Sequence, residues 1–248
     1  MIKDLEFLFK NLFFSEKFLL EKRLKRAIKK NYEKELSIIS SFKNPKKDAV
    51  DVGVYRGIYS YKLSKEFKHV YSFEPNPLIY PYLKKNLTKI IKNMSLQNLA
   101  ISDNNGEINL KIPSRRKSIF KTNYEELYKL GCATIHKQNK IQNYNSFKVK
   151  KIKLDDILKN KDISFIKIDV EGHEKEVING SKNIIINNRP TLLVEIEERH
   201  SNYPVNETIK FINNLGYNSF YAKNNNLYKT NDLIDINSEN NFIFLPNN

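Results

Sequence analysis

The sequence contains a single cysteine, Cys132, among 248 residues. One thiol excludes an intramolecular disulfide and a cysteine-based zinc cluster, and it favours a reducing compartment. A long apolar run is also missing, because the stretch from Leu12 to Phe14 is interrupted at once by Ser15-Glu16-Lys17. We therefore expect neither a secretory signal nor a membrane-spanning helix, and we predict a soluble, cytoplasmic protein.

Acidic residues are outnumbered, and the basic excess is uneven. The net charge is +15; residues 1–47 hold 13 Lys and Arg against 6 Asp and Glu, and residues 111–153 hold 12 against 2. Two basic segments beside a nearly neutral remainder raise the local concentration of anionic partners. Lysines that only keep the protein soluble are the alternative interpretation.

Apolar residues recur at helical spacing between residues 2 and 39, with lysines between them. This pattern predicts an amphipathic helical extension over residues 1–47, before a catalytic domain over residues 48–248. The extension would pack against the core or a second subunit, which makes a homodimer an open expectation. Its five phenylalanines would also suit peripheral docking at a membrane surface.

Short apolar runs alternate with helical patterns from Asp48 onward. Strands are predicted at 49–52, 69–73, 96–101, 163–169, 191–196, 218–222 and 241–245, and helices at 58–66, 77–91, 174–187 and 206–215. This alternation indicates an α/β fold, a seven-stranded and mostly parallel sheet with helices on both faces. Two further strands, 106–112 and 147–152, flank a basic, polar segment at 113–146. That segment is too long for a plain connection and predicts a lid-like insertion.

Four residues fall at the carboxyl ends of predicted strands: Asp51, Gly53, Glu74 and Asp169. Ligands of doubly wound sheets bind outside these ends. Gly53, with Gly57 beyond it, would let the backbone approach a ligand closely. Glu74 is placed to accept hydrogen bonds from the two hydroxyls of a ribose.

The first glycine of a dinucleotide motif is absent, since the spacing is D-x-G-x-x-x-G and Asp51 occupies its place. An acid there would repel a pyrophosphate, whereas it can pair with the ammonium of a methionine moiety. The pattern thus favours S-adenosylmethionine over NAD as the cofactor. A turn that merely connects a strand to a helix is the alternative.

Several motifs carry a resemblance to a known family. They are DVGVYRGIYS (51–60), FEPNP (73–77), LAISD (99–103), LDD (154–156), IKIDVEGHE (166–174) and RPTLLVE (189–195). In order and spacing they resemble the FkbM family of S-adenosylmethionine-dependent methyltransferases, over about residues 48 to 200. The resemblance implies a Rossmann-like class I methyltransferase sheet and O-methylation of a hydroxyl on a sugar, glycan or secondary metabolite.

The resemblance also implies a set of cofactor-binding residues. Asp51, Gly53, Gly57 and Ser60 would line the methionine end, Glu74 with Pro75 and Asn76 would hold the ribose, Ala100, Ile101 and Ser102 would border the adenine, and Asp169 would lie beside them. The family usually has Ala-Asn where this chain has Val54-Tyr55. The contacts of the first loop are thus where we expect differences.

A sugar hydroxyl is a poor nucleophile, so a base or a metal should help to remove its proton. Asp169 is our candidate base or hydroxyl acceptor, with Glu171 and His173 shaping the site and His200 as the second choice of base. A divalent ion held by Asp169 with Glu195 or Glu171 is conceivable, but nothing in the spacing requires it, and no metal is predicted.

Other functions stay open at this point. Ribose methylation of RNA suits the basic segments, although base methylation is disfavoured by the sequence after Asp169 and by the position of Cys132. A non-catalytic module that only binds the cofactor is the other alternative. For the enzyme, we expect an acceptor that is anionic or linked to a polymer, covered by the lid-like insertion.

Overall fold

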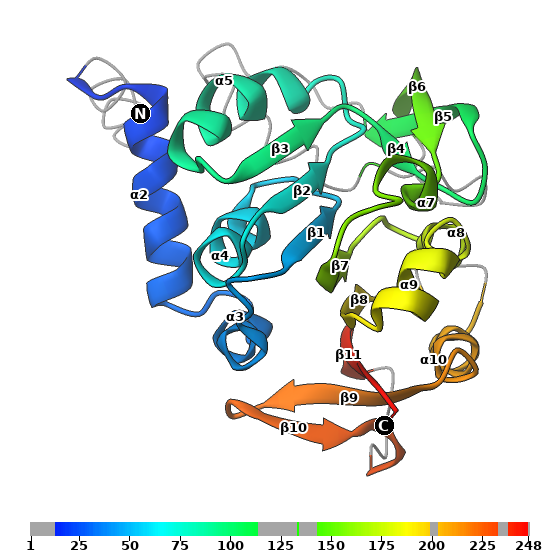
Figure 1. Ribbon diagram of the computed structural model, residues 1–248. Helices are drawn as coiled ribbons and strands as arrows, with labels where there is room; N and C mark the ends of the chain where they lie inside the picture. Colours follow the sequence, from blue (N-terminus) through cyan, green and yellow to red (C-terminus); the bar gives the residue numbers. More distant parts are fainter. Residues whose placement is uncertain (1–12, 114–132, 134–142, 199–202, 233–237, 248) are drawn as a thin grey trace.

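Short apolar strands and the helices between them form a layered α/β structure in a computed structural model (Figure 1). The structure describes residues 13–113, 133, 143–198, 203–232 and 238–247. Eight strands form one sheet in the order β10-β9-β11-β8-β7-β1-β2-β3, parallel from β3 to β8 and antiparallel from β8 to β10. Their bounds are β1 (Asp48–Val52), β2 (Val70–Phe73), β3 (Met94–Gln97), β7 (Ile163–Ile168), β8 (Thr191–Glu195), β9 (Tyr217–Lys223), β10 (Asn226–Lys229) and β11 (Asn241–Pro246).

Helices cover both faces of this sheet. One face carries α3 (Glu35–Ile38), the 3-10 helix η1 (Ile39–Phe42) and α4 (Ile58–Glu66), with α2 (Glu16–Lys29) and α5 (Tyr80–Ile90) beside α4. The other face carries α7 (Leu154–Ile157), α8 (Glu174–Asn179), α9 (Lys182–Asn188) and α10 (Val205–Asn213). A last 3-10 helix, η2 (Thr230–Asp232), follows β10.

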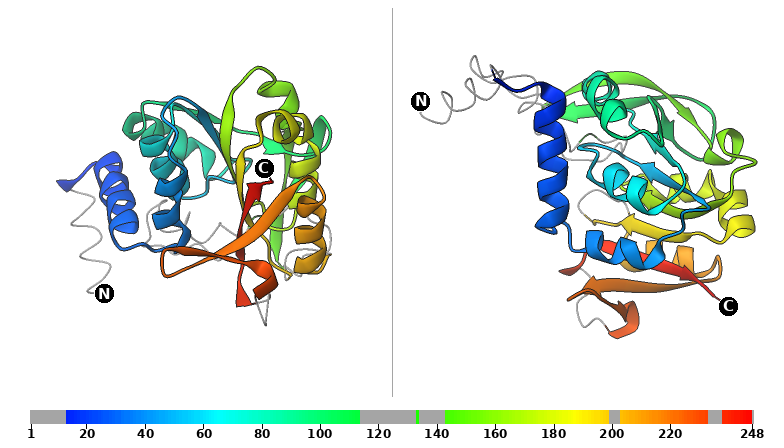
Figure 2. Two further views of the ribbon diagram at one scale, coloured as in Figure 1. Left: turned by 60° about the horizontal axis from the view of Figure 1, so that its bottom comes forward. Right: turned by 60° about the vertical axis from the view of Figure 1, so that its left-hand side comes forward.

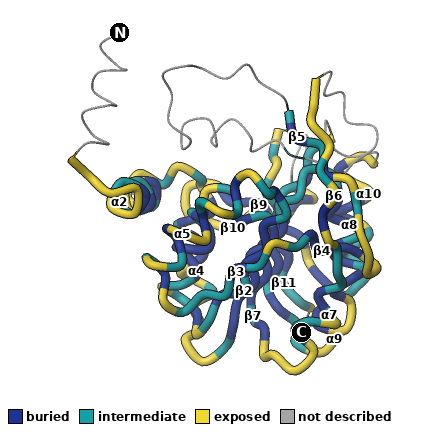
Figure 3. Tube along the Cα trace, turned by 90° about the horizontal axis from the view of Figure 1, so that it is seen from above, coloured by how far each residue is buried: buried dark blue, intermediate teal, exposed yellow. Residues whose placement is uncertain are grey.

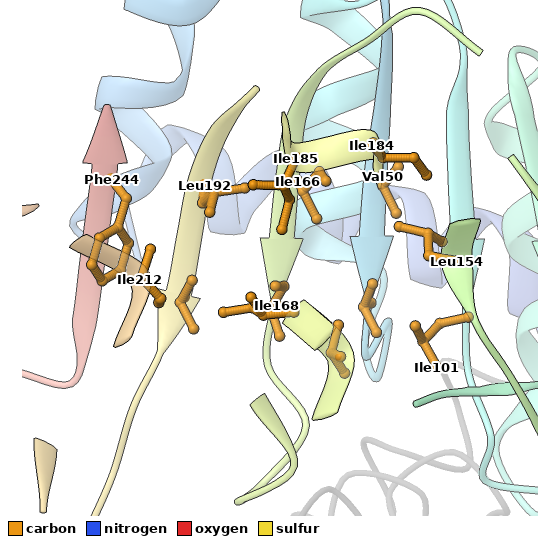
Figure 4. Packing of buried hydrophobic residues seen from close by; sticks show 14 of the residues in the cluster. Val50, Ile101, Leu154, Ile166, Ile168, Ile184, Ile185, Leu192, Ile212 and Phe244 are labelled. Carbon is orange, nitrogen blue, oxygen red and sulfur yellow. The ribbon is translucent and has the colours of Figure 1, made fainter. Parts of the chain in front are cut away.

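The central strands are buried on both faces, which is why they read as continuous apolar runs. Ala49 of β1 packs toward the α4 side, whereas its neighbour Val50 packs toward α9 with Ile166 and Ile185 (Figure 4). In Figure 3 the buried residues concentrate in the strands, and exposed residues follow the loops and outer helix faces. Alternate residues of one strand therefore serve two separate cores.

Helix α2 lies along α4 and α5 (Figure 2). It begins after Ser15, whose hydroxyl accepts a hydrogen bond from the backbone N–H of Phe18 at 3.2 Å. Leu20 and Leu24, one turn apart, are buried in a cluster with Leu83 and Leu87 of α5. Of the positions left open for the amphipathic extension, α2 thus packs on the core, while residues 1–12 lie outside the described part.

The large sheet has eight strands where the sequence predicts seven. The additional strand, β10, forms a hairpin with β9 through Asn224 and Asn225, both in the left-handed region with φ of 51° and 61°. Two left-handed residues suit the tight turns of hairpins, and asparagine tolerates that conformation. The strand was missed because the sequence NLYK is short and mostly exposed, and only Leu227 packs against the core.

The strand predicted at 96–101 is wrong as a single element. β3 belongs to the large sheet, whereas β4 (Ala100–Ile101) joins β6 (Tyr144–Ile152) and β5 (Gly106–Pro113) in a separate three-stranded sheet. Between them, the Asn98 side chain donates hydrogen bonds to the carbonyls of Glu74 at 2.7 Å and Pro75 at 3.1 Å. The predicted insertion at 113–146 lies mostly outside the described residues.

The helix predicted at 174–187 is divided at Gly180 into α8 and α9. A Cβ on Gly180 would lie 1.9 Å from the carbonyl oxygen of Ser102. Only glycine allows this approach of the chain to the loop after β4, and the helix is interrupted there. Among the helices of the described residues, none has the length and apolar character needed to cross a membrane.

Glu35 of α3 is a buried acid beneath the sheet, 1% exposed, and its Oε1 makes no hydrogen bond within the described residues. Burial raises the pKa of Glu35 to about 7. Below pH 4.5 Glu35 is protonated in both the folded and the unfolded chain, so its burial costs no free energy of ionisation. As pH rises from 4.5 through 7, the unfolded chain loses the proton first and the folded state loses stability. Relative to wild type, we expect Glu35→Gln to gain about 3 kcal/mol between pH 4 and pH 8.

Chemical denaturation of both proteins at the two pH values measures this difference. Glu33→Gln is the matched control, because it removes the same charge two residues away from a position that is not buried. An equal gain for both variants, or none for Glu35→Gln, would contradict the assignment.

Candidate active site

A row of polar side chains crosses the otherwise apolar sheet on its α4 side. Asp51 of β1 stands in register with Ser72 of β2 on one side and with Lys167 of β7 on the other. All three are buried, at 0%, 0% and 3% exposure. Buried charges of this kind are stable only when paired and hydrogen-bonded.

Lys167 is the centre of this row. Its Nζ donates hydrogen bonds to the carbonyl oxygen of Gly53 at 2.9 Å and to Asp169 Oδ2 at 3.0 Å, and it lies 3.8 Å from Asp51 Oδ1. The ammonium also stands over the ring of Tyr59 at 4.8 Å. Burial lowers the pKa of Lys167, but the charges of Asp169 and Asp51 outweigh it and raise that pKa above its usual value. Lys167 is therefore a permanent cation.

The sequence interpretation missed Lys167, although a signal was present. A lysine within the strand Ile163–Ile168, at a position that alternates inward with Phe165, is an anomaly in a strand buried on both faces. Such a residue requires anionic partners in the same layer, and Asp51 and Asp169 were the available candidates.

Asp51 lies beneath the loop from Gly53 to Gly57, called the glycine loop below, and its carboxylate has no exposed surface. Ser60 of α4 donates to Asp51 Oδ2 at 2.5 Å and lies 3.0 Å from Ser72 Oγ, whereas Asp51 Oδ1 makes no hydrogen bond within the described residues. Burial raises the pKa of Asp51, despite the opposing effect of Lys167. In this arrangement Asp51 and Ser60 join β1 to α4.

The two glycines of the loop have packing reasons that are independent of a ligand. Gly53 has φ of +87°, and a Cβ on it would lie 1.8 Å from the carbonyl oxygen of Asp169. Gly57, with φ of +77°, precedes α4, and a Cβ there would lie 2.6 Å from Leu87 Cδ2. Gly53 thus allows the loop to lie directly against Asp169, the residue that follows β7.

Glu74, at the end of β2, faces the same loop. Its Oε2 accepts the backbone N–H of Tyr55 at 2.8 Å, and its Oε1 accepts that of Asn76 at 2.9 Å. Burial raises the pKa of Glu74 to about 7, against the lowering effect of these two hydrogen bonds. Each oxygen keeps a second lone pair, so the carboxylate can still accept hydroxyl hydrogen bonds.

Tyr55 occupies the position at which the resemblance led us to expect a difference. It has φ of +46°, a region that asparagine adopts more readily than an aromatic residue. The ring is held by Arg56, whose guanidinium lies 4.8 Å from the ring centroid and donates to the Tyr55 hydroxyl at 3.0 Å. The family's usual asparagine thus has a conformational explanation here.

A very small acidic pocket, with a volume of about 10 Å³, lies beyond the ends of β7 and β8. Its lining residues are Asp169, Glu171, Gly172, Glu174, Glu195 and Glu197. Asp169 is partly accessible, with 26% of its side chain exposed, and Glu171 is held at φ of +54°. Burial and then the charge of Asp169 raise the pKa of Glu195, so this neighbour carries a proton at neutral pH. Asp169 and this protonated neighbour thus line the same pocket.

Four other predicted site residues are buried near the small three-stranded sheet. His173, 7% exposed, has its Nε2 2.9 Å from Ser102 Oγ, and its Nδ1 lies 3.5 Å from Glu176 Oε2. Ala100, Ile101 and Ser102 are likewise buried in and after β4. His173 therefore ties α8 to the small sheet. His200 lies outside the described residues.

Some of the residues predicted to bind the cofactor lie together where β1, β2 and β7 end. Glu74, Pro75 and the loop beginning at Gly53 lie together and could hold a ribose, with Asp169 next to the loop. Asp51 is buried beneath the loop and Glu74 is nearly so, at 0% and 6% exposure, and the pairing of Asp51 with an ammonium group stays a prediction. Within the described residues, no group of three or more His, Cys, Asp and Glu side chains is arranged to hold a metal ion.

Comparisons with known proteins agree with this fold. A family model described as the methyltransferase FkbM domain matches residues 51–219. A crystal structure of a methyltransferase FkbM from Methylobacillus flagellatus has a TM-score of 0.52 at 14% identity, covering 81% of this chain and 44% of that one. This chain thus spans less than half the length of that relative.

Two more distant similarities concern an rRNA methylase from Streptococcus thermophilus and a precorrin-6y C5,15-methyltransferase from Geobacter metallireducens. Their TM-scores are 0.47 and 0.44 at 13% and 10% identity; the first covers 86% of this chain and 95% of that one, the second 85% and 84%. No curated protein matches the sequence.

Proposed function

Because the chain belongs to the FkbM family of S-adenosylmethionine-dependent methyltransferases, we propose that it methylates a hydroxyl group of a sugar, glycan or secondary metabolite. One observation carries the proposal. Lys167 connects the glycine loop, through the carbonyl of Gly53, to the partly exposed carboxylate of Asp169. The loop that would hold the cofactor and the candidate base are thereby fixed to one another.

Glu74 and the loop from Gly53 to Gly57 would hold the cofactor. The carboxylate of Glu74 is already oriented by the N–H groups of Tyr55 and Asn76, so ribose hydroxyls meet a preorganised acceptor. When bound, S-adenosylmethionine supplies a methyl group activated by its sulfonium. The protein then needs mainly to align the acceptor oxygen and to exclude water.

Asp169 would accept the proton of the acceptor hydroxyl. An alcohol has a pKa far above neutrality, so proton removal during transfer lowers the barrier. Lys167 holds Asp169 Oδ2 at 3.0 Å, which leaves Oδ1 for the acceptor. Glu195, protonated at neutral pH, and Glu171 would form hydrogen bonds to the remaining hydroxyls of a polyol.

Cofactor binding is the first test. We expect S-adenosylmethionine at one hundred times its Kd to stabilise the fold by about 2.7 kcal/mol, since it binds the native state only. NAD at the same concentration should leave the melting temperature unchanged. Differential scanning fluorimetry measures the effect of each compound on the melting temperature of wild type and of Glu74→Ala. Glu107→Ala, at an exposed site on β5, is the control. Stabilisation by NAD instead would contradict the cofactor assignment.

Methyl transfer is the second test. Methyl-labelled S-adenosylmethionine is incubated with the protein and with fractions of a cell extract that contain glycans, lipids, RNA or small metabolites. An O-methyl ether in a glycan or metabolite fraction, stable to the mild alkali that cleaves methyl esters, supports the proposal. Label confined to RNA, or binding of the cofactor without transfer to any fraction, would support one of the alternative functions instead.

A further inference from the structure

A second pocket, away from the acidic one, lies between α2 and the start of α4, with a volume of about 220 Å³. Its floor is apolar and consists of Leu20, Leu24 and Ala27 of α2 with Ile58 of α4. Its remaining lining residues are Arg23, Arg26, Arg56 and Tyr32. Figure 2 shows how α2 runs past α4 at this side of the molecule.

Three arginines therefore line one small cavity, from two segments that are distant in sequence. Arg23 and Arg26 are one turn apart on α2 and project to the same side of that helix. Arg56 comes from the glycine loop and is oriented by its stacking on Tyr55. Arginine forms paired hydrogen bonds to phosphate and carboxylate oxygens, and a cluster of arginines favours the group with more charge and more acceptors.

We propose that this pocket binds the phosphate group of the acceptor, with its apolar floor against the atoms next to the phosphate. The inference rests on the proposed function and names a substrate class for it: a phosphorylated hydroxyl compound. A volume of about 220 Å³ is below that of sites for whole drug-sized ligands, and it suits one charged group with the ring or short chain attached to it.

The position of Arg56 connects this pocket to the reaction. Arg56 follows Tyr55, whose N–H donates to Glu74, and three residues before it Gly53 contacts Lys167 and the end of β7. A phosphate held by Arg56 is therefore anchored at the loop that would hold the cofactor. The pocket would position the acceptor by its charge, while Asp169 acts on its hydroxyl.

Phenyl phosphate is a suitable probe, because it joins a phosphate to a small apolar ring. Binding to the full chain is measured by calorimetry, beside inorganic phosphate and phenol. We expect phenyl phosphate to bind more tightly than either fragment. Arg23→Gln and Arg56→Gln should each weaken binding by about tenfold, as expected for a lost charged hydrogen bond.

Lys22→Gln is the matched control, because it removes the same charge from an exposed residue of α2 that does not line the pocket. It should change the Kd less than twofold. Equal weakening by all three variants would mean that phosphate is attracted only by the general basic charge of α2. Unchanged binding in Arg23→Gln and Arg56→Gln would also overturn the inference.

Kinetics separate this inference from the proposed function. Once an acceptor is labelled, phenyl phosphate should inhibit competitively against that acceptor and not against S-adenosylmethionine. Methyl transfer that phenyl phosphate does not inhibit would refute the phosphate site and leave the methyltransferase intact. Arginine-dependent binding of the probe in a protein that methylates nothing would refute the function and not the site.

Discussion

Replacing Asp169 by Asn should lower kcat for methyl transfer by about 10²- to 10⁴-fold, the usual contribution of a positioned general base. The amide cannot take up the hydroxyl proton. It keeps the shape of the carboxylate, and its oxygen can still accept the hydrogen bond from Lys167. The Kd for S-adenosylmethionine should therefore change little, and the fold should persist because the carboxylate of Asp51 still lies 3.8 Å from Lys167. Steady-state kinetics with the acceptor, together with calorimetric titration of the cofactor, measure the two effects separately.

Asp162→Asn is the control for this variant. Asp162 precedes the same strand, β7, at its opposite end, and its exposed carboxylate pairs with Lys47 at 2.9 Å. The same chemical change there should leave kcat unaltered. If Asp169→Asn instead retains kcat and loses cofactor affinity, Asp169 is a structural partner of Lys167 and not the base.

Replacing Lys167 by Met should destabilise the fold by about 3 to 5 kcal/mol, because the substitution removes the buried cation and leaves its acidic neighbours unpaired. Methionine fills much of the same volume and is itself well tolerated in a core. The loss would come from three groups: Asp51, Asp169 and the carbonyl of Gly53. The free energy of unfolding is measured by urea titration at neutral pH, and the cofactor Kd should rise with it because the loop is released.

A surface ion pair provides the comparison. Lys47→Met breaks the pair with Asp162 and should cost at most about 1 kcal/mol, since exposed pairs contribute little. The double variant Lys167→Met/Asp51→Asn should recover part of the loss, because the second change removes one of the buried charges. A cost for Lys167→Met no greater than that for Lys47→Met would refute the central role of Lys167.

The sequence alone determined the elements whose signals are local. The alternation of strands and helices, the loop with Gly53 and Gly57, and the acids at strand ends follow from periodicity and spacing within short segments. The helix at 58–66 was predicted with the bounds that α4 has. The resemblance to the FkbM family rests on the same short motifs, and the family model confirms it.

Predictions failed where a contact distant in sequence decides the local structure. The carbonyl of Ser102 requires glycine at position 180 and divides the predicted helix, and Asn98 lies where the chain passes from one sheet to the other. These contacts involve segments far apart in the chain. No window of neighbouring residues contains both partners.

Tertiary structure also decided the surroundings of individual charges. Strand ends place Asp51 and Asp169 at one edge, but only the register of β1 against β7 pairs Asp51 with Lys167 beneath the loop and leaves Asp169 partly exposed. The arginine pocket likewise needs α2 packed beside α4. The burial and the neighbours of a charged side chain limit the roles it can have, and only folding determines both.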